Sequence, residues 1–510
     1  MKYVGFRTTM KKIIISENPW QTRIAITINE RLQNIYFESH TVDSLERCYF
    51  KGKITKVLPG IQTAFVDIGQ EKAGFLHISE IDREMAFARM SDQTDELENR
   101  EATPRRQSTM EISKILREGD PILVQVSKEP IYEKGAKLTT CFTLPGRFIV
   151  LMPNIPRVGV SKKIEEREER QRLKELVIAN LPEGMGAIIR TTSESAKDRD
   201  IIKDIEFLVQ TWQTIQKKFA QAEFQEKIHE DLPLVLQVVR DSLDEDVEAV
   251  IVNTQEAQNK VYRFVKEIAP EQVQKVKLYQ EPPNLFDIFN INKQLEEALD
   301  KKVELKSGGS LIIETTEAMT VIDVNTGKFI GKKSLDDTIL KTNLEAAQEV
   351  ARQLRLRNIG GLIVIDFIDM AHSAHRQQLI RFFEKTLKEE DKFQSVVLKV
   401  SEFGLVQMTR KRSGKTLIQQ LMDTCQTCAG RGFVKSLQTH CVELLDNFKK
   451  ELQSGSPEGK IVLRVNPSIF KNITNIEYNT VLALEKQFNC AITLVSEPGF
   501  AVDQYKIERP

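Results

Sequence analysis

One stretch, residues 320 to 370, constrains the fold of this chain more than any other. It begins and ends with short apolar runs that each hold one aspartate, Asp323 in the first and Asp366 in the second. Between the runs, apolar residues recur at steps of four and three, as on one face of a helix: Leu340, Leu344, Ala347, Ala351 and Leu354. Gly360 and Gly361 predict the end of that helix. The stretch is therefore predicted to form a strand, a crossover helix and a second strand.

The two aspartates are predicted to face each other at one edge of a sheet, in buried surroundings. Strands joined by a crossover helix run parallel, so both acids lie toward the carboxyl ends, where open α/β sheets bind ligands. On neighbouring strands, about 4.8 Å apart, two like charges repel unless a cation separates them or one acid keeps its proton. Magnesium suits such a pair, since it takes one or two carboxylates plus water and phosphate oxygens. The alternatives are that each aspartate only caps a turn, and that Asp369 is a third ligand or the start of the next helix.

The charge balance of the chain gives no overall attraction to nucleic acid or membrane. The 510 residues are 41% hydrophobic and 29% charged, with 73 Lys and Arg against 73 Asp and Glu. A polyanion site must therefore be local, and the basic run at 408–415 either reaches a polyanion near the acids or is a solvated face. No apolar run approaches eighteen residues and the first residues lack a signal-peptide core. We expect a cytoplasmic protein without a membrane span, with Met10 as an alternative start.

Residues 43 to 142 consist of short alternating runs separated by Gly and Pro turns, which is typical of a small antiparallel barrel such as an OB-fold. A charged stretch at 82–113 interrupts the pattern and is predicted to be an insertion. If the intervening apolar residues face the core, Phe65 and Phe75 point outward on adjoining strands. Together with nearby lysines they predict a stacking platform for single-stranded bases: Lys51, Lys53, Lys56, Lys134 and Lys137. The alternative is that the two rings pack against a neighbouring domain.

Residues 185 to 191 read as a strand that ends in Arg190 and Thr191, just before a long helix. A guanidinium and hydroxyls in that position can bind an oxyanion through charge-assisted hydrogen bonds. An ordinary helix cap explains the hydroxyls equally well, so the phosphate site and the cap both remain open.

Cys425 and Cys428 form the chain's single C-x-x-C pair, and glycines follow at offsets that suit a tight metal-binding turn. Structural zinc takes four ligands, and no second such pair exists. Three interpretations remain: a half-site completed by another copy of the chain, a site completed by His440 or Cys441, and a redox dithiol. The redox case is the weakest, because we predict no thioredoxin-like βαβ unit around the pair. A shared half-site predicts a zinc-linked homodimer.

Several motifs stand in the order and spacing of one known family. They are Ile-Asp-Val-Asn-Thr-Gly around Asp323, and the runs at 343–347, 352–357, 365–370 and 403–412, the last similar to the shorter family member. With these motifs over nearly its whole length, the chain resembles the bacterial ribonuclease E/G family.

The resemblance implies a multidomain α/β fold with six parts. These are an RNase H-like part split between 1–42 and 236–298, an OB-fold barrel at 43–142, a 5′-sensor region at 143–235, a DNase I-like catalytic domain at 299–420, a zinc link at 421–435, and a small α+β dimerisation domain at 436–510. It also implies magnesium-dependent endonucleolytic cleavage of single-stranded, A/U-rich RNA, stimulated by a 5′-monophosphate, in RNA processing and decay, with ribosomal RNA precursors among the expected substrates.

Site residues follow from the matching positions. Asp323 and Asp366 would hold the magnesium and Asn325 would orient the site. Phe65, Phe75 and Lys134 would line the RNA channel, and Arg190, Thr191 and the backbone near Val150 would bind the terminal phosphate. Cys425 and Cys428 would form half of a zinc site that two protomers share. Whether such dimers pair into tetramers is left open. Lys162 stands where the family commonly has a second sensor arginine. A lysine cannot reproduce the bidentate fork of a guanidinium, so weaker or differently arranged end sensing is expected.

Two rival functions remain at the level of the sequence. In the first, the chain is a non-catalytic RNA-binding scaffold whose acids only hold structure. In the second, it is a magnesium phosphodiesterase that acts on DNA or small nucleotides. Cleavage and binding assays separate these from a ribonuclease.

Overall fold

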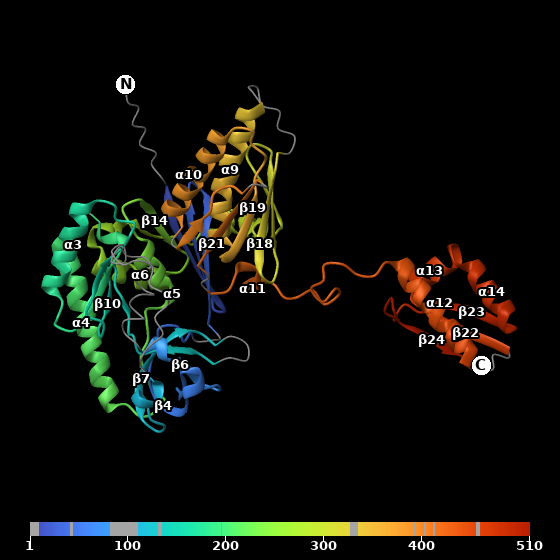
Figure 1. The fold of residues 1–510 in the computed structure, drawn as a ribbon, viewed down its shortest axis with the longest axis horizontal. Coiled ribbons are helices and arrows are strands. Elements are labelled where there is room, and N and C mark those ends of the chain that lie inside the picture. Colours follow the sequence, from blue (N-terminus) through green and yellow to red (C-terminus); the bar gives the residue numbers. More distant parts are fainter. Residues whose placement is uncertain are drawn as a thin grey trace. The chain divides into compact units, whose positions relative to one another are not determined.

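The computed structural model describes residues 10–40, 44–81, 111–130, 135–194, 196–326, 335–391, 393–401, 404–411, 414–454 and 459–509. The chain divides into two compact units, residues 1–420 and 421–510, and each is described by itself. The described residues form five sheets with helices packed on them, which is the expected multidomain α/β fold (Figure 1). The predicted insertion at 82–113 lies outside the described residues except for its last three positions.

The first sheet joins strands that are far apart in the sequence. Its order is β15 (Val276–Leu278), β14 (Val247–Val252), β1 (Lys11–Glu17), β2 (Gln21–Ile28) and β3 (Arg31–Ser39). Alternate residues of β1 enter two different cores. Ile13 and Ile15 pack with α5 (Leu234–Ser242) and α6 (Gln255–Ile268), whereas Ile14 packs with α7 (Leu285–Ile288) and α8 (Ile291–Glu297). Both faces of this sheet are therefore covered, and this is the part that the resemblance describes as RNase H-like.

The second sheet is a closed barrel. Its strands are β4 (Tyr49–Leu58), β5 (Thr63–Asp67), β6 (Gly74–His77), β8 (Lys137–Thr139) and β7 (Pro121–Lys128), and β7 pairs back to β4. The short helix α2 (Ile112–Ile115) contributes Ile112 to the core, and β13 (Lys227–His229) adds to β4 from outside. The core contains Ala64, Val66, Ile68, Leu76 and Ile78, as the alternation predicts.

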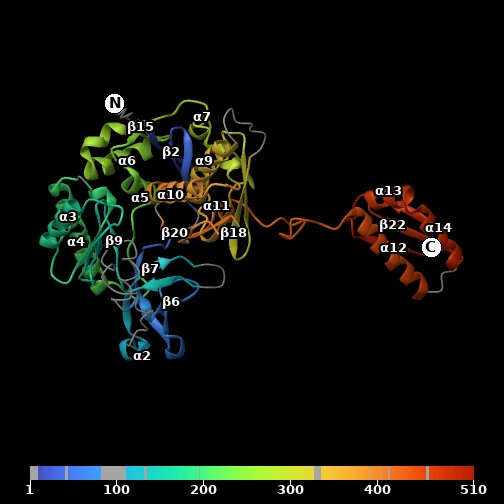
Figure 2. The ribbon, with the colours of Figure 1, turned by 45° about the horizontal axis from the view of Figure 1, so that its top comes forward.

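A third sheet and two helices follow the barrel in the sequence and precede α5. The strands are β11 (Val158–Val160), β12 (Gly186–Ile189), β10 (Ile149–Met152) and β9 (Leu144–Pro145), with α3 (Arg167–Asn180) and α4 (Asp198–Gln221) packed on them. The 24-residue helix α4 is about 36 Å long at 1.5 Å per residue. Figures 1 and 2 show it running from this sheet to the barrel. The third sheet and the barrel are thus joined by a continuous helix.

The two-acid stretch belongs to a fourth sheet. Its order is β16 (Lys302–Glu304), β17 (Ser310–Thr315), β18 (Met319–Asn325), β19 (Gly361–Asp366), β21 (Leu405–Arg410) and β20 (Ser395–Val397). The helices α9 (Leu335–Leu356) and α10 (Ser373–Glu390) pack on it, and α11 (Leu417–Leu421) follows. The predicted strand, crossover helix and strand are therefore present, with β18 and β19 parallel.

The end of α9 differs from the expectation. The helix stops at Leu356, ahead of the two glycines, and Gly361 already belongs to β19. Asn358 takes the left-handed conformation with φ of 51°, and the backbone N–H of Ile359 returns to Leu354 O at 2.9 Å. Asparagine tolerates this conformation better than other residues with a Cβ, so the predicted glycine stop was wrong by a few residues.

The second unit is a small α+β domain. Its sheet has the order β23 (Cys490–Ser496), β22 (Gly459–Val465) and β24 (Tyr505–Glu508), and its helices are α12 (Leu437–Ser454), α13 (Pro467–Asn475) and α14 (Tyr478–Phe488). Across the described part of the chain, no helix is long and apolar enough to cross a membrane.

Candidate active site

Asp323 and Asp366 are direct neighbours in the fourth sheet. β18 and β19 are parallel, and their last paired positions bring the Cα of Asp323 opposite that of Asp366. Both residues stand at the carboxyl ends of their strands, because a right-handed crossover helix returns the chain to the same edge. The predicted geometry of the two acids is therefore present.

The expected burial of the two acids was wrong, because both side chains are exposed. Along β18 and β19, Ile322 and Ile365 point toward α9 and α10 and are fully buried, so the alternate residues face the opposite side of the sheet. Val321 on that side is 38% exposed and Leu362 is 41% exposed, so the described residues leave it open. A substrate can therefore reach the acids directly.

The two carboxylates influence each other electrostatically. Partial burial raises the pKa of Asp366, and the negative charges of Asp323 and then Asp369 raise it further. A cation between the acids would remove this repulsion. The donor set, two exposed carboxylates with open approach, fits magnesium, which keeps several water or phosphate oxygens among its ligands.

Asp369 does not complete a metal cluster. Among the residues that the structure describes, no group of three or more His, Cys, Asp and Glu side chains could hold an ion. Asp369 instead lines a cavity of about 520 Å³ beyond the end of β19, together with Arg376 and Ser401. The helix α10 begins only at Ser373.

Two asparagines brace the acids. Asn325 Nδ2 donates to Asp323 Oδ2 at 2.8 Å, so it contacts the carboxylate that we predicted it to orient. Asn343, on α9, donates from Nδ2 to Ile368 O at 2.8 Å and accepts from Ile368 N at 3.1 Å, which ties the loop after Asp366 to the helix. Sequence reasoning assigned Asn343 no role. One feature of the sequence could have indicated a role: Asn343 lies three positions after Leu340 and four before Ala347, so it is a polar residue on the apolar face of the predicted helix.

The barrel presents the predicted aromatic pair on its outer face. Phe65 and Phe75 are cross-strand partners and both are partly exposed. Lys56 pairs with Phe65 on one side, and Lys137 pairs with Phe75 on the other. A row of two rings between two lysines thus crosses β4, β5, β6 and β8, although Lys137 also forms a 2.5 Å ion pair with Glu80. Lys134 lies outside the described residues.

Two other lysines of β4 contact α4 or the segment that follows it. Lys51 Nζ donates to Phe219 O at 3.1 Å and to Ala222 O at 2.8 Å, so it caps the carboxyl end of α4. Lys53 stands over the ring of Phe224, 5.6 Å from its centroid. Both lysines therefore make contacts within the protein, because β4 also borders the segment that follows α4, and their contact with RNA stays a prediction.

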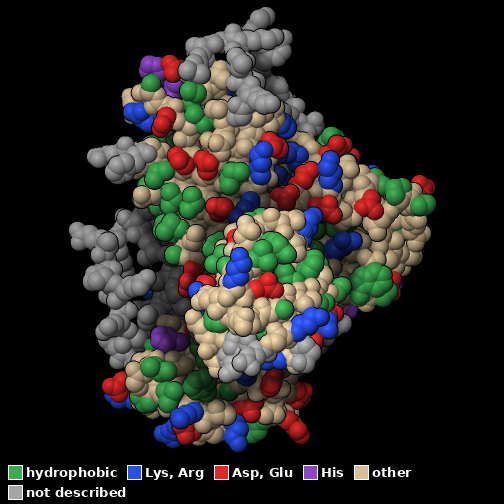
Figure 3. Space-filling model, turned by 90° about the vertical axis from the view of Figure 1, so that its right-hand side faces the viewer, with side chains coloured by type: hydrophobic (Ala, Val, Ile, Leu, Met, Phe, Trp, Pro, Cys, Tyr) green, Lys and Arg blue, Asp and Glu red, His purple; other side chains and the backbone are tan. Residues whose placement is uncertain are grey.

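The basic run at 408–415 is only partly available to a ligand. Arg410 is buried and forms a two-pronged ion pair with Asp391, with Nε to Oδ2 at 2.6 Å and NH2 to Oδ1 at 3.0 Å. Lys411 and Lys415 are exposed, and residues 412 and 413 lie outside the described residues. Basic and acidic side chains are interspersed over the face drawn in Figure 3.

The predicted phosphate residues gather at one edge of the third sheet. Arg190 and Thr191 follow the end of β12, Lys162 follows the end of the parallel strand β11, and Val150 lies on the adjoining strand β10. Thr191 and Lys162 are exposed, while Thr192 and Ser193 donate to Arg147 O at 2.5 Å and Phe148 O at 2.7 Å. The neighbouring hydroxyls thus bind backbone carbonyls just ahead of β10 and cap neither the short 3-10 turn at 191–193 nor α4, while Thr191 is exposed.

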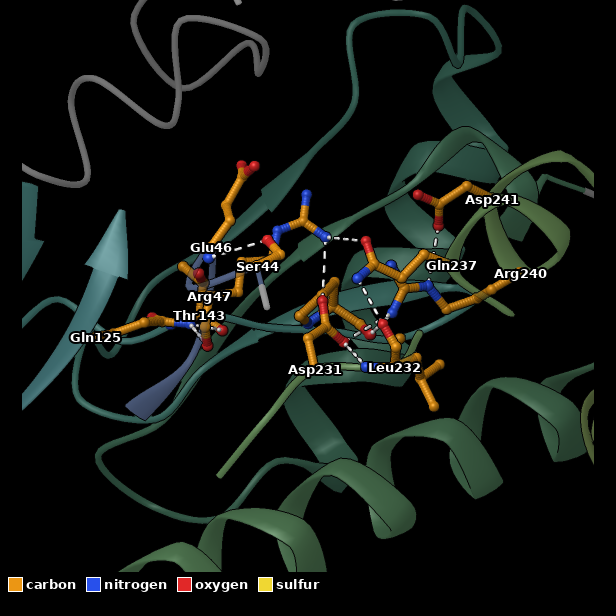
Figure 4. A network of polar contacts seen from close by, with 12 residues as sticks. Ser44, Glu46, Arg47, Gln125, Thr143, Asp231, Leu232, Gln237, Arg240 and Asp241 are labelled. Atoms are coloured by element: carbon orange, nitrogen blue, oxygen red, sulfur yellow. Dashed lines mark hydrogen bonds and ion pairs between the residues drawn. The ribbon is translucent and has the colours of Figure 1, made fainter. Parts of the chain in front are cut away.

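Arg190 is already engaged by protein groups. NH1 donates to Gly146 O at 2.6 Å and pairs with Asp241 Oδ1 at 2.9 Å. Asp241 lies on α5 beside Arg240, in a polar network that links the barrel, the third sheet and α5 (Figure 4). A terminal phosphate at Arg190 must therefore compete with a carboxylate, which sequence reasoning did not anticipate.

The two cysteines of the C-x-x-C pair lie in a turn ahead of α12. Backbone N–H groups of Cys428 and then Thr427 lower the pKa of the Cys425 thiol, which favours the thiolate that binds metal. Ala429, Gly430 and Gly432 have positive φ, as a tight turn requires. Cys441 is fully buried in the core of the second unit, so it cannot join this pair without unfolding that core.

The fold and the site define a multidomain α/β protein that combines an OB-fold barrel with two carboxylates at a sheet edge. Family models match the chain in three places: the S1 RNA binding domain at residues 49–136, the Ribonuclease E/G family at 143–413, and the RNase E/G thioredoxin-like domain at 424–510. Ribonuclease G of Escherichia coli (strain K12) is 35% identical over 496 residues, 97% of this chain and 99% of that protein. The chain belongs to the ribonuclease E/G family.

Two further relatives show how the lengths compare. Ribonuclease G of Haemophilus influenzae is 38% identical over 477 residues, 94% of each chain. Ribonuclease E of Escherichia coli (strain K12) is 34% identical over 98% of this chain but only 46% of its own length. The chain thus corresponds to nearly all of a ribonuclease G, as the run at 403–412 indicated.

The match at 424–510 bears on one expectation about the cysteines. We predicted no thioredoxin-like βαβ unit around the pair and did not expect that the stretch with both cysteines would match a thioredoxin-like domain, as it does. In the structure, β22 and β23 are parallel and joined by α13 and α14, whereas Cys425 and Cys428 precede α12. The pair therefore lies outside the strand-helix-strand unit of that domain.

Proposed function

We propose that the chain is an endoribonuclease that cleaves single-stranded RNA by magnesium-assisted hydrolysis and leaves 5′-phosphate and 3′-hydroxyl ends. The observation that carries this proposal is the side-by-side position of Asp323 and Asp366 on an open sheet edge. The names of the relatives, ribonucleases G and E, support the choice of substrate.

The two aspartates would hold the magnesium ion on the exposed side of β18 and β19. Bound magnesium supplies charge for the phosphate oxygens and lowers the pKa of a water ligand. Asn325 fixes the orientation of the Asp323 carboxylate through its 2.8 Å hydrogen bond. Asn343 holds the backbone of Ile368 and so restrains the segment that carries Asp366.

The barrel would bind the single strand on which this site acts. Bases stack on aromatic rings regardless of sequence, and Phe65 and Phe75 offer two adjacent rings on an outer face. Lys56 and Lys137 flank the rings and supply positive charge for the backbone. The family resemblance adds Lys134 to the proposed RNA-binding residues, and the same resemblance favours A/U-rich substrates.

Cleavage would be stimulated by a 5′-monophosphate at the edge formed by Arg190, Thr191 and the backbone of Val150. The exposed hydroxyl of Thr191 and the guanidinium of Arg190 are suitable donors to phosphate oxygens. Lys162 lies at the same edge but offers a point charge instead of a fork. We therefore propose weaker end sensing than in relatives with two arginines, and roles in the processing of ribosomal RNA precursors and in RNA decay.

Cys425 and Cys428 would form half of a zinc site that two protomers share. In one chain, the described residues supply no third ligand for a cluster, and Cys441 is buried elsewhere. A second copy supplies the missing two thiolates and closes a tetrahedral site. The proposed state is a zinc-linked homodimer, which further pairing could extend to a tetramer.

One assay tests chemistry and end sensing together. A short A/U-rich RNA with either a 5′-monophosphate or a 5′-hydroxyl is incubated with the protein, with and without magnesium, and the product ends are mapped. We expect magnesium-dependent cleavage to a 5′-phosphate and a 3′-hydroxyl, faster for the monophosphate. Binding without cleavage would favour the RNA-binding scaffold, and cleavage of a matched DNA but not of RNA would favour the phosphodiesterase.

A further inference from the structure

The guanidinium of Arg190 is held by a carboxylate from a different part of the chain. Arg190 follows β12, whereas Asp241 lies near the end of α5, and the two groups meet at 2.9 Å. Arg190 is 23% exposed and Asp241 is 26% exposed, so the pair is within reach of a ligand from solvent. A carboxylate in contact with a guanidinium occupies the position that a phosphate oxygen would take.

A second guanidinium converges on the same oxygen atom. Arg240 Nε donates to Asp241 Oδ1 at 2.9 Å, and Arg240 NH1 donates to Pro145 O at 2.9 Å (Figure 4). Arg240 is only 3% exposed. Its buried NH2 group has no hydrogen-bond partner among the described residues. Asp241 therefore serves two arginines, and Arg240 NH1 also pairs with Asp231 Oδ1 at 3.5 Å.

We propose that Asp241 is a built-in competitor for the 5′-terminal phosphate: it occupies Arg190 until a phosphate monoester displaces it. This inference rests on the proposed end-phosphate site and adds its regulation. A terminal phosphate carries close to two negative charges and three acceptor oxygens. An internal phosphodiester carries one charge and two free oxygens, like the carboxylate itself. Asp241 thus reserves Arg190 for the chain end and keeps weaker anions out.

The Asp241 carboxylate is charged at neutral pH. Burial raises the pKa of Asp241, but Arg190 and Arg240 outweigh that effect and bring the pKa to about 2. Displacement also leaves no uncompensated charge, because Asp241 retains Arg240 as its partner when Arg190 turns to the phosphate. The exchange therefore breaks the ion pair between Arg190 and Asp241 and forms one between Arg190 and the more highly charged terminal phosphate.

Removal of the competing charge is the direct test. Asp241→Asn keeps the shape of the side chain and removes its charge, and Asp241→Ser provides a second variant should the amide fail to fold. Asp198→Asn is the matched control, because Asp198 is an exposed acid of the same region that pairs with Arg172 instead. Binding of fluorescent RNAs with a 5′-monophosphate or a 5′-hydroxyl is measured by anisotropy without divalent metal, so that no strand is cut.

The expected result is that Asp241→Asn binds the 5′-monophosphorylated RNA about tenfold more tightly, with a smaller change for the 5′-hydroxyl RNA and no change in the control. Suppose that the wild type binds the 5′-monophosphorylated RNA more tightly than the 5′-hydroxyl RNA. If Asp241→Asn then binds the phosphorylated RNA no more tightly than the wild type does, the competition is overturned and end sensing stands. If the wild type shows no preference, stimulation as proposed fails. In that case, tighter binding of the 5′-monophosphorylated RNA than of the 5′-hydroxyl RNA by Asp241→Asn supports the competition. If this variant also binds the two RNAs equally, both the competition and the end-phosphate site are rejected.

Discussion

Replacement of Asn343 by alanine tests whether a buried amide on α9 keeps Asp366 in position. Asn343 is fully buried, and its amide makes hydrogen bonds of 2.8 Å and 3.1 Å to the backbone of Ile368. Alanine removes both bonds and leaves the N–H and C=O of Ile368 without this partner. Each lost bond costs about 1 kcal/mol, so the free energy of unfolding of the first unit should fall by roughly 2 kcal/mol.

The expected loss of activity is larger than the loss of stability. Asp366 is two residues before Ile368, and a displacement of about 1 Å in a catalytic group can reduce the rate about 100-fold. Thr342→Ala is the matched control, since Thr342 is equally buried on α9 but its hydroxyl bonds within the helix, to Thr338 O at 3.0 Å. The control should lose stability but keep its kcat.

Two measurements on the same preparations decide the question. Denaturant unfolding gives the change in the free energy of unfolding. Cleavage at saturating RNA and magnesium, at a temperature well below the unfolding transition of both variants, gives kcat. A kcat for Asn343→Ala that equals that of Thr342→Ala would show that the amide stabilises the domain without positioning Asp366, and this reasoning would be refuted.

Three further predictions follow from the other sites. Wild-type protein should carry about one zinc per two chains, and Cys428→Ser should lose the metal and sediment as a monomer; a full zinc per chain would instead indicate His440 as a ligand. Phe65→Ala and Phe75→Ala should each weaken RNA binding by about 1–3 kcal/mol, seen as a higher KM with kcat nearly unchanged, and an unchanged KM would contradict stacking. The pKa of Asp241 lies at about 2 in the folded protein against an ordinary 3.8. This difference stabilises the fold by about 2 kcal/mol above pH 4, and the stabilisation is lost as the pH falls toward 2. The difference in unfolding free energy between wild type and Asp241→Asn should shrink over that range, and a constant difference would contradict the assignment.

Local periodicity predicted the parts of the fold that depend on near neighbours in the sequence. The steps of three and four from Leu340 to Leu354 gave α9, and because crossover connections are right-handed, they also placed Asp323 opposite Asp366. Alternation in β5 and β6 likewise gave the outward positions of Phe65 and Phe75.

Contacts between distant segments could not be predicted in the same way. The exposure of the two acids depends on what covers the second face of the fourth sheet, and apolar residues such as Val321 and Leu362 suggested a cover that the described residues do not provide. Lys51 was assigned to RNA because nothing local shows that the end of α4 lies beside β4. The pairing of Arg190 with Asp241 joins segments on different elements, which a pattern within either one cannot reveal.

The most direct test of the proposed nuclease site compares binding and cleavage in Asp323→Asn and Asp366→Asn. Each variant removes one charge from the exposed pair and keeps its side-chain volume, so folding and RNA affinity should be nearly those of the wild type. Magnesium-dependent cleavage of a short single-stranded RNA should fall by several orders of magnitude, on the order of 10³-fold or more. Wild-type cleavage rates in both variants would contradict the assignment of Asp323 and Asp366 as the catalytic pair.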